Sequence, residues 1–339
     1  MKQAGMFEMD NRLGKIDSNG DPLVKLNEVI DWELFRPELE RVRQKERKSN
    51  AGRKPYDAVM MFKVLVVQSL YNLADDAVEF QILDRLSFMR FLGLSIGDSV
   101  PDAKTVWLFR EELREAGVIE KLFARFDRHL RDNGFSARKG QIIDASIVSA
   151  PAQRNTGEEN EALKAGLAPE WWSEEKLRQK DVDARWTKKG GRSYFGYKNH
   201  MCVDVKHKLI RGYEVTDASV HDSRVFEDLL DEGNTSRDVW ADAAYRSEGA
   251  IENMEADGYR EHIQRKGVRG KELTEWEKQG NQTRAKTRAR IEHVFGVQAK
   301  RAGCLIVRTI GIWRARAKIG LRNLAYNLDR YGTLKMAKA

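Results

Sequence analysis

The chain has 339 residues, of which 41% are hydrophobic and 33% are charged, so it can form one large domain or two of ordinary size. It contains no run of 18 apolar residues and no apolar stretch at its start, which predicts neither a membrane-spanning helix nor a secretion signal. Its two cysteines lie far apart and fit neither a disulfide framework nor a Cys/His zinc site, which indicates a reducing, cytoplasmic compartment.

The net charge of +8 is concentrated in one C-terminal stretch. Residues 260–318 hold 16 Lys and Arg against 5 Asp and Glu, whereas the rest of the chain holds 44 against 47. Such an excess can be a solvated basic face. Its local concentration, and the aromatic residues within it, favour a polyanion and therefore nucleic acid as the partner.

The sequence before about residue 135 predicts helices and no strands. Residues 1 to about 50 are expected to form a partly ordered lead-in that ends at a breaker-rich boundary, Asn50 to Pro55. Pro55 is expected at the first position of a buried helix, and Asp102 is expected to cap a later one. We therefore predict an all-α N-terminal domain over residues 1–135, with helices over about 55–70, 75–92, from 102 onward, and 118–130.

The pattern changes at Gly140, after which strands and helices alternate. Residues 141–148 are rich in β-branched side chains and predict a strand. The polar residues 152–193 form an insertion, which in a compact domain usually means a functional or mobile segment. This second domain, residues 136–339, is predicted to be α/β, with a hairpin (197–205 and 208–215), helices (222–231, 247–256 and 283–301) and further strands (237–242 and 260–264).

Three carboxylates stand out by their positions in these elements. Asp144 lies within an apolar strand, Asp242 ends a later strand, and Glu292 lies in the last predicted helix. Singly, they are best interpreted as a solvated strand residue, a turn residue and a surface residue paired with Arg288. Together, they could gather as hard oxygen ligands for two magnesium ions, the arrangement that phosphoryl transfer on DNA uses.

Several basic side chains are candidates for contacts with DNA. Arg288 stands four residues before Glu292, so a continuous helix would present both on one face, where a guanidinium could bind a phosphate beside the metals. The insertion offers a basic segment around two glycines, although a solvated loop is the simpler interpretation. The further candidates are Lys188, Lys189, Arg192, Lys198, His200, Lys300 and Arg301.

Short stretches spread over most of the chain resemble the transposases of bacterial insertion sequences, within the DDE superfamily and closest to insertion-sequence family five. They occur in that family's order and are GRKPY (52–56), SVPD (99–102), IIDAS (142–146), FGYKNH (195–200), HDS (221–223), ADAAYR (241–246) and RIEHVFG (290–296). The resemblance implies an RNase H-like core, a mixed sheet flanked by helices, behind a helical DNA-binding domain. It also implies that Asp144, Asp242 and Glu292 are the catalytic residues and hold two Mg²⁺ ions, with Mn²⁺ as a substitute.

The same resemblance implies a transposase that binds the inverted-repeat ends of a mobile element, cleaves them and joins them to target DNA. Its partner would be double-stranded DNA, bound by a homo-oligomer in the bacterial cytoplasm, at the nucleoid and not at a membrane. Two positions of a family motif around the glutamate are alanine here, Ala285 and Ala299, which leaves a hairpin release pathway open. The alternatives are an inactive, transposase-derived DNA-binding protein and a metal-dependent DNA nuclease.

Overall fold

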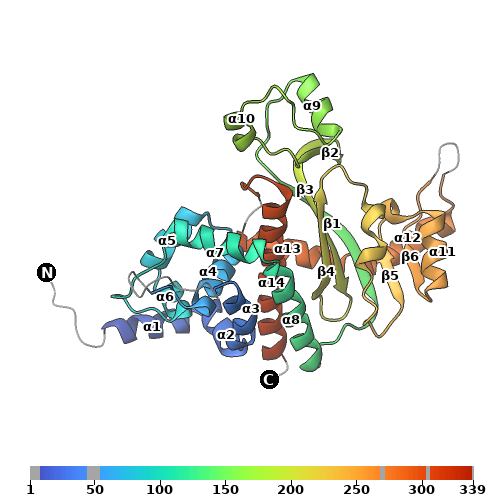
Figure 1. The fold of residues 1–339 in the computed structure, drawn as a ribbon. Coiled ribbons are helices and arrows are strands. Elements are labelled where there is room, and N and C mark those ends of the chain that lie inside the picture. The colour runs from blue at the N-terminus through green and yellow to red at the C-terminus, as the bar shows by residue number, and fades with distance from the viewer. Residues whose placement is uncertain (1–7, 44–53, 268–271, 303–305, 338–339) are drawn as a thin grey trace. The chain divides into compact units, whose positions relative to one another are not determined.

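The computed structural model describes residues 8–43, 54–267, 272–302 and 306–337 (Figure 1). The chain forms two compact units. The first takes in Met1–Phe126 and Leu324–Ala339, and the second takes in Asp127–Asn323. Two helices, α8 (Val118–Asp132) and α14 (Ile312–Met336), therefore contribute residues to both units. The domains predicted at 1–135 and 136–339 stay a prediction.

The first unit is helical. Helices already form before residue 50, where the sequence predicted only a partly ordered lead-in. The sequence did contain a helix-start signal there, Asp21 followed by Pro22. In the structure the Asp21 carboxylate caps α2 by accepting a hydrogen bond from the Leu23 backbone N–H (2.9 Å). The helices and 3₁₀ turns are α1 (Glu8–Ser18), α2 (Pro22–Val29), η1 (Trp32–Phe35), α3 (Arg36–Arg41), α4 (Ala58–Tyr71), α5 (Asp75–Asp84), α6 (Leu86–Leu92) and α7 (Ala103–Glu115).

Local capping decides where these helices begin and end. The cap predicted at Asp102 is confirmed by a hydrogen bond from the Thr105 amide (2.6 Å). Helix α4 begins after Asp57 and not at Pro55, because the Asp57 carboxylate accepts from the Met60 amide (2.9 Å). The single helix predicted over 75–92 is two helices, α5 and α6, because Arg85 has an extended backbone (φ −109°, ψ 112°).

Within the described ranges, no single helix is both long and apolar enough to cross a membrane. Helices α4 and α5 pass that test only as a pair, and the pair is bent by 103°.

The second unit is built on one six-stranded mixed sheet. Strand β1 pairs antiparallel with β3 on one side and parallel with β5 on the other, and β6 continues the parallel part. Strand β3 also pairs with β2 and β4. The bounds are β1 (Gln141–Ser149), β2 (Arg185–Lys189), β3 (Arg192–Asp204), β4 (Ile210–Asp217), β5 (Asp238–Ala241) and β6 (Arg260–Ile263).

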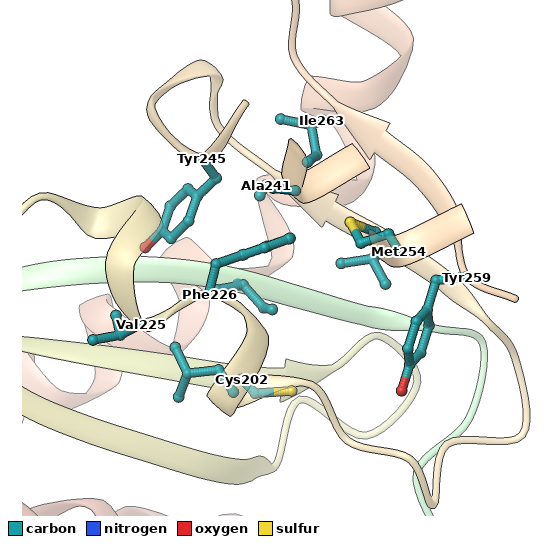
Figure 2. Close-up of a cluster of buried hydrophobic side chains, with 12 residues drawn as sticks. Cys202, Val225, Phe226, Ala241, Tyr245, Met254, Tyr259 and Ile263 are labelled. Atoms are coloured by element: carbon teal, nitrogen blue, oxygen red, sulfur yellow. The ribbon is translucent and has the colours of Figure 1, made fainter. Parts of the chain in front are cut away.

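Both faces of this sheet are covered. Ile143 of β1 lies opposite Cys202 of β3, and both pack with Phe226 and Tyr245 on one face (Figure 2). Successive side chains of a strand point to opposite faces, and Val148 of β1 and Tyr197 of β3 pack with α14 on the second face. The predicted fold class, a mixed sheet flanked by helices, is confirmed. The covering elements include η2 (Asp222–Val225), η3 (Glu227–Leu229), η4 (Ala243–Tyr245), α11 (Glu248–Ala256), α12 (Glu275–Arg288) and α13 (Arg290–Ala302).

Three helical segments after residue 220 differ from the sequence prediction. The helix expected over 222–231 consists of the two short 3₁₀ turns η2 and η3. The helix expected over 283–301 is divided at Ala289 into α12 and α13. Helix α14, with 25 residues, was not predicted, because its residues 321–328 are all buried and such a helix shows no single apolar stripe.

The polar insertion over 152–193 is folded. It contains α9 (Gly157–Lys164) and α10 (Glu174–Gln179), and it leads into β2. The Glu159 carboxylate joins the two helices by accepting hydrogen bonds from the Trp172 indole (2.8 Å) and the Lys176 ammonium (2.6 Å). The buried Asp181 accepts from the Tyr197 hydroxyl of β3 (2.7 Å), which fixes the insertion to the sheet.

Candidate active site

Asp144 and Asp242 lie side by side where two parallel strands part. The register of β1 and β5 pairs Ile143 with Ala241, and the next residue of each strand is an aspartate. Asp242 thus follows the carboxyl end of β5, and Asp144 is the first residue of β1 beyond that pairing. The carboxyl ends of parallel strands are the usual place for active sites in α/β sheets.

Gln264 extends this arrangement by one strand. The β5–β6 register pairs Ala241 with Ile263, and the backbone N–H of Gln264 donates to the Ala241 carbonyl (3.1 Å). Asp144, Asp242 and Gln264 therefore follow one another across β1, β5 and β6, and we call them the strand-end row. Gln264 was not predicted as a site residue, because an amide after a short strand gives no sequence signal.

Arg288, the last residue of α12, bridges the ends of the row. Its Nε and Nη2 atoms lie 3.2 Å from Asp144 Oδ2, and its Nη1 donates to Gln264 Oε1 (3.0 Å). The sequence suggested that Arg288 pairs with Glu292 or binds a DNA phosphate. In the structure its partner is Asp144, because α12 ends at Arg288 and the helical spacing to Glu292 is interrupted.

Each aspartate is also fixed by the backbone. Asp144 Oδ1 accepts from the Ala145 amide (2.8 Å), and Asp242 Oδ1 accepts from the Ala244 amide (2.8 Å), which caps η4. Asp144 is only 5% exposed. Burial raises the pKa of its carboxyl group, and the negative charge of Asp242 raises it further, while the charges of Arg288 and Lys189 oppose both. Two carboxylates in this position favour a bound cation.

Glu292 does not join the two aspartates. It lies in the first turn of α13, and its side chain is exposed. Among the residues that the structure describes, no three His, Cys, Asp or Glu side chains converge closely enough to hold a metal ion. The aspartate pair nevertheless has the chemistry that magnesium prefers, since this ion is often bound through one or two carboxylates and keeps waters as its other ligands. The donor set thus fits one divalent ion, and the two-metal site stays a prediction.

The predicted basic residues fall into different surroundings. Lys188, Lys189 and Arg192 are exposed at the tip of the β2–β3 hairpin, whose turn is formed by two glycines with positive φ (59° and 77°). The charge of Lys189 opposes the rise in the pKa of Asp144 that burial causes, so the tip acts electrostatically on the strand-end row. The side chains of Lys300 and Arg301 in α13 lie outside the described residues.

Two predicted DNA contacts on β3 are engaged by other groups of the protein. Lys198 donates to the Val220 carbonyl (2.7 Å) and to Asp222 Oδ1 (2.8 Å). His200 is fully buried, and its Nε2 is hydrogen-bonded to the Thr216 hydroxyl (2.9 Å). This burial argues against His200 as a DNA contact. The prediction placed it on the surface because strand alternation alone does not tell which face is covered.

Asp222 lies among the charged groups around Lys198 and the two site aspartates, although the sequence gave it no predicted role. Its turn, η2, packs against η4, which follows Asp242. The hydroxyl of the fully buried Tyr245 in η4 has a raised pKa because of burial and because of the charges of Asp222, Asp144 and Asp242. Figure 2 shows Tyr245 beside Phe226. The centroids of the two rings are 5.4 Å apart. The sequence did offer a signal for Asp222, since it is the central residue of the HDS stretch at 221–223 that resembles the transposase family.

Two family models match the chain. Residues 135–328 match the transposase DDE domain, and residues 11–112 match a transposase domain, DUF772. Among solved structures, the chain is similar to the piggyBac transposase in a synaptic complex with hairpin DNA. The TM-score is 0.48 at 12% identity, and the match covers 94% of this chain and 76% of that chain. Because the first family model spans more than half of the 339 residues, this chain belongs to the DDE transposase family.

Proposed function

We propose that the chain is the transposase of a bacterial insertion sequence, close to insertion-sequence family five. It binds the inverted-repeat ends of its element as a homo-oligomer, cleaves them, and joins them to target DNA in the cytoplasm. The observation that carries this proposal is the pair Asp144 and Asp242, fixed side by side at the strand ends of a DDE domain. The exposed basic tip of the β2–β3 hairpin supports a DNA backbone as substrate.

In this proposal each site residue has a stated task. Asp144 and Asp242 would hold Mg²⁺ or Mn²⁺, which supplies Lewis acidity and activates a water for attack on phosphorus. Glu292 is the third acidic residue on the strength of the family resemblance, and the α12–α13 junction at Ala289 is the point that must bend to bring it closer. Lys188, Lys189 and Arg192 hold the DNA backbone, and Arg288 binds a phosphate beside the aspartates.

A second candidate is a transposase-derived DNA-binding protein without catalysis. It is favoured by the exposed position of Glu292 and by the Arg288 guanidinium that contacts Asp144. The position of the two aspartates next to each other at the strand ends argues for the active enzyme. A nuclease is the third candidate, and it would cleave without joining.

The test is to incubate the protein with the DNA that flanks its own gene, with and without Mg²⁺. Cleavage at the element ends that requires the metal supports the enzyme, and binding without cleavage supports the inactive protein. Transfer of pre-cut ends into a target plasmid then separates a transposase from a nuclease.

A further inference from the structure

Both oxygens of the Asp144 carboxylate are contacted by groups of the protein itself. One oxygen, Oδ1, accepts from the Ala145 amide at 2.8 Å. The other, Oδ2, lies 3.2 Å from both Nε and Nη2 of Arg288. The Asp144 side chain is 7% exposed and the Arg288 side chain 26%, so this ion pair is only partly open to water. A metal ion that uses Oδ2 therefore has to compete with the guanidinium.

Gln264 holds the guanidinium in that position from the other end of the row. Its Oε1 atom accepts from Arg288 Nη1 at 3.0 Å, and its backbone is fixed to β5 through the Ala241 carbonyl. Because its amide is neutral, it orients Arg288 without taking the positive charge away from Asp144. A glutamate at this position would share that charge.

We propose that the Arg288 guanidinium, positioned by Gln264, occupies the place of a cation beside Asp144 in the metal-free protein. It must leave Asp144 Oδ2 before that oxygen can bind a divalent metal. The inference rests on the proposed function, because it assumes that Asp144 and Asp242 are metal ligands. Once released, the guanidinium presents planar paired N–H donors that match a phosphate. The exchange would thus link metal loading of the site to the arrival of a DNA backbone.

The test measures the binding of Mn²⁺ to the full-length, DNA-free protein by isothermal titration calorimetry. In Arg288→Gln the metal no longer displaces a charge-assisted pair, and we expect a Kd lower by about ten-fold. In Gln264→Met the guanidinium loses its second anchor, and we expect a smaller gain, roughly three-fold. Asp144→Asn should remove the binding, which identifies the site that is being titrated.

The matched control is Arg290→Gln, which removes the same charge two residues away. Arg290 donates to the Val205 carbonyl (3.0 Å), and we expect its variant to bind Mn²⁺ within about two-fold of the parent. An equal gain in this control would mean that net charge alone sets the affinity and would overturn the proposal. Unchanged binding in Arg288→Gln and Gln264→Met would overturn it as well.

Two further readouts keep the outcomes separable. Failure of parent and variants alike to bind Mn²⁺ would overturn the metal-dependent function itself, whereas parent binding without a gain in the variants overturns only the role of Arg288. Addition of a duplex from the DNA that flanks the gene should raise the Mn²⁺ affinity of the parent and leave that of Arg288→Gln nearly unchanged. Circular dichroism checks folding, and Gln264→Met decides alone if Arg288→Gln does not fold.

Discussion

At the scale of single residues, Asp144 and Asp242 are the most direct test of the proposed chemistry. Asn has nearly the shape of Asp but lacks its negative charge, so we expect Asp144→Asn and Asp242→Asn to lose metal binding and to keep the strand pairing. We expect each variant to abolish cleavage while it still binds element ends, because affinity for DNA comes mainly from basic residues. Gel shift and cleavage on the same preparations measure both. Glu292→Ala should behave in the same way if it is the third ligand, and parent-like cleavage would remove it from the site.

His200 gives a residue-scale prediction about pH and stability. Burial lowers its pKa from 6.5 to about 4, while the charge of Asp222 acts against this shift and that of Lys198 adds to it. Between these pH values the unfolded chain binds a proton and the folded protein does not, so stability falls as the pH decreases from 6.5 toward 4. The loss is on the order of 3 kcal/mol at most. Urea unfolding at pH 7 and 4.5 should show a smaller loss in His200→Gln, and an equal loss would contradict this assignment.

Sequence reasoning identified some site residues and not others, for physical reasons. Asp144 was visible because a carboxylate inside an apolar strand is unusual. The partner of Arg288 was not predictable, because that contact joins residues 144 positions apart and depends on how α12 packs. Gln264 was missed for a similar reason, since only the register of β6 against β5 brings it into the row.

At the scale of elements, the β2–β3 hairpin makes a testable contribution to DNA binding. Its tip exposes Lys188, Lys189 and Arg192 on a two-glycine turn. Replacement of all three by Ala should weaken DNA binding and reduce the log–log salt slope by about 0.9 for each phosphate that the variant no longer binds. Fluorescence anisotropy over a salt series measures this slope. Arg154, Lys164 and Arg178 are exposed elsewhere in the insertion, and their triple Ala variant is the control. Equal slopes for both variants would exclude the hairpin tip.

The elements also show where the fold could be predicted. Strands β1, β5 and β6 were identified because β-branched and aromatic residues occur between turn signals. The break between α12 and α13 was not, because Ala289 is a good helix former and nothing local requires the helix to end there. Helix α14 was missed because Arg and Lys are interleaved with its apolar residues, and one of these basic residues, Arg322, is itself buried.

At the scale of the whole molecule, the described residues 324–337 belong to the first unit, far from its other residues in the sequence. Leu324, Leu328 and Tyr331 are buried, and the Tyr331 ring packs edge-on against Phe126 at 5.8 Å. A chain that ends at Asn323 loses these three side chains, each worth roughly 1.5–3 kcal/mol, which together approach the stability of a whole domain. We expect this truncation to lower the helical circular dichroism signal and the melting temperature sharply. A chain that ends at Lys335 keeps all three and should melt like the parent.

The composition of the first unit bears on how the protein is made. Domains generally fold from the N-terminus during synthesis, each as its residues leave the ribosome. Here the unit of residues 8–126 also includes residues 324–337, so it cannot be completed until those residues have been translated. A product released early by a stop codon or a frameshift would therefore carry an unfinished helical unit. If that unit recognises the ends of the mobile element, only copies translated beyond these residues can act on DNA, and shorter copies cannot occupy those ends in their place.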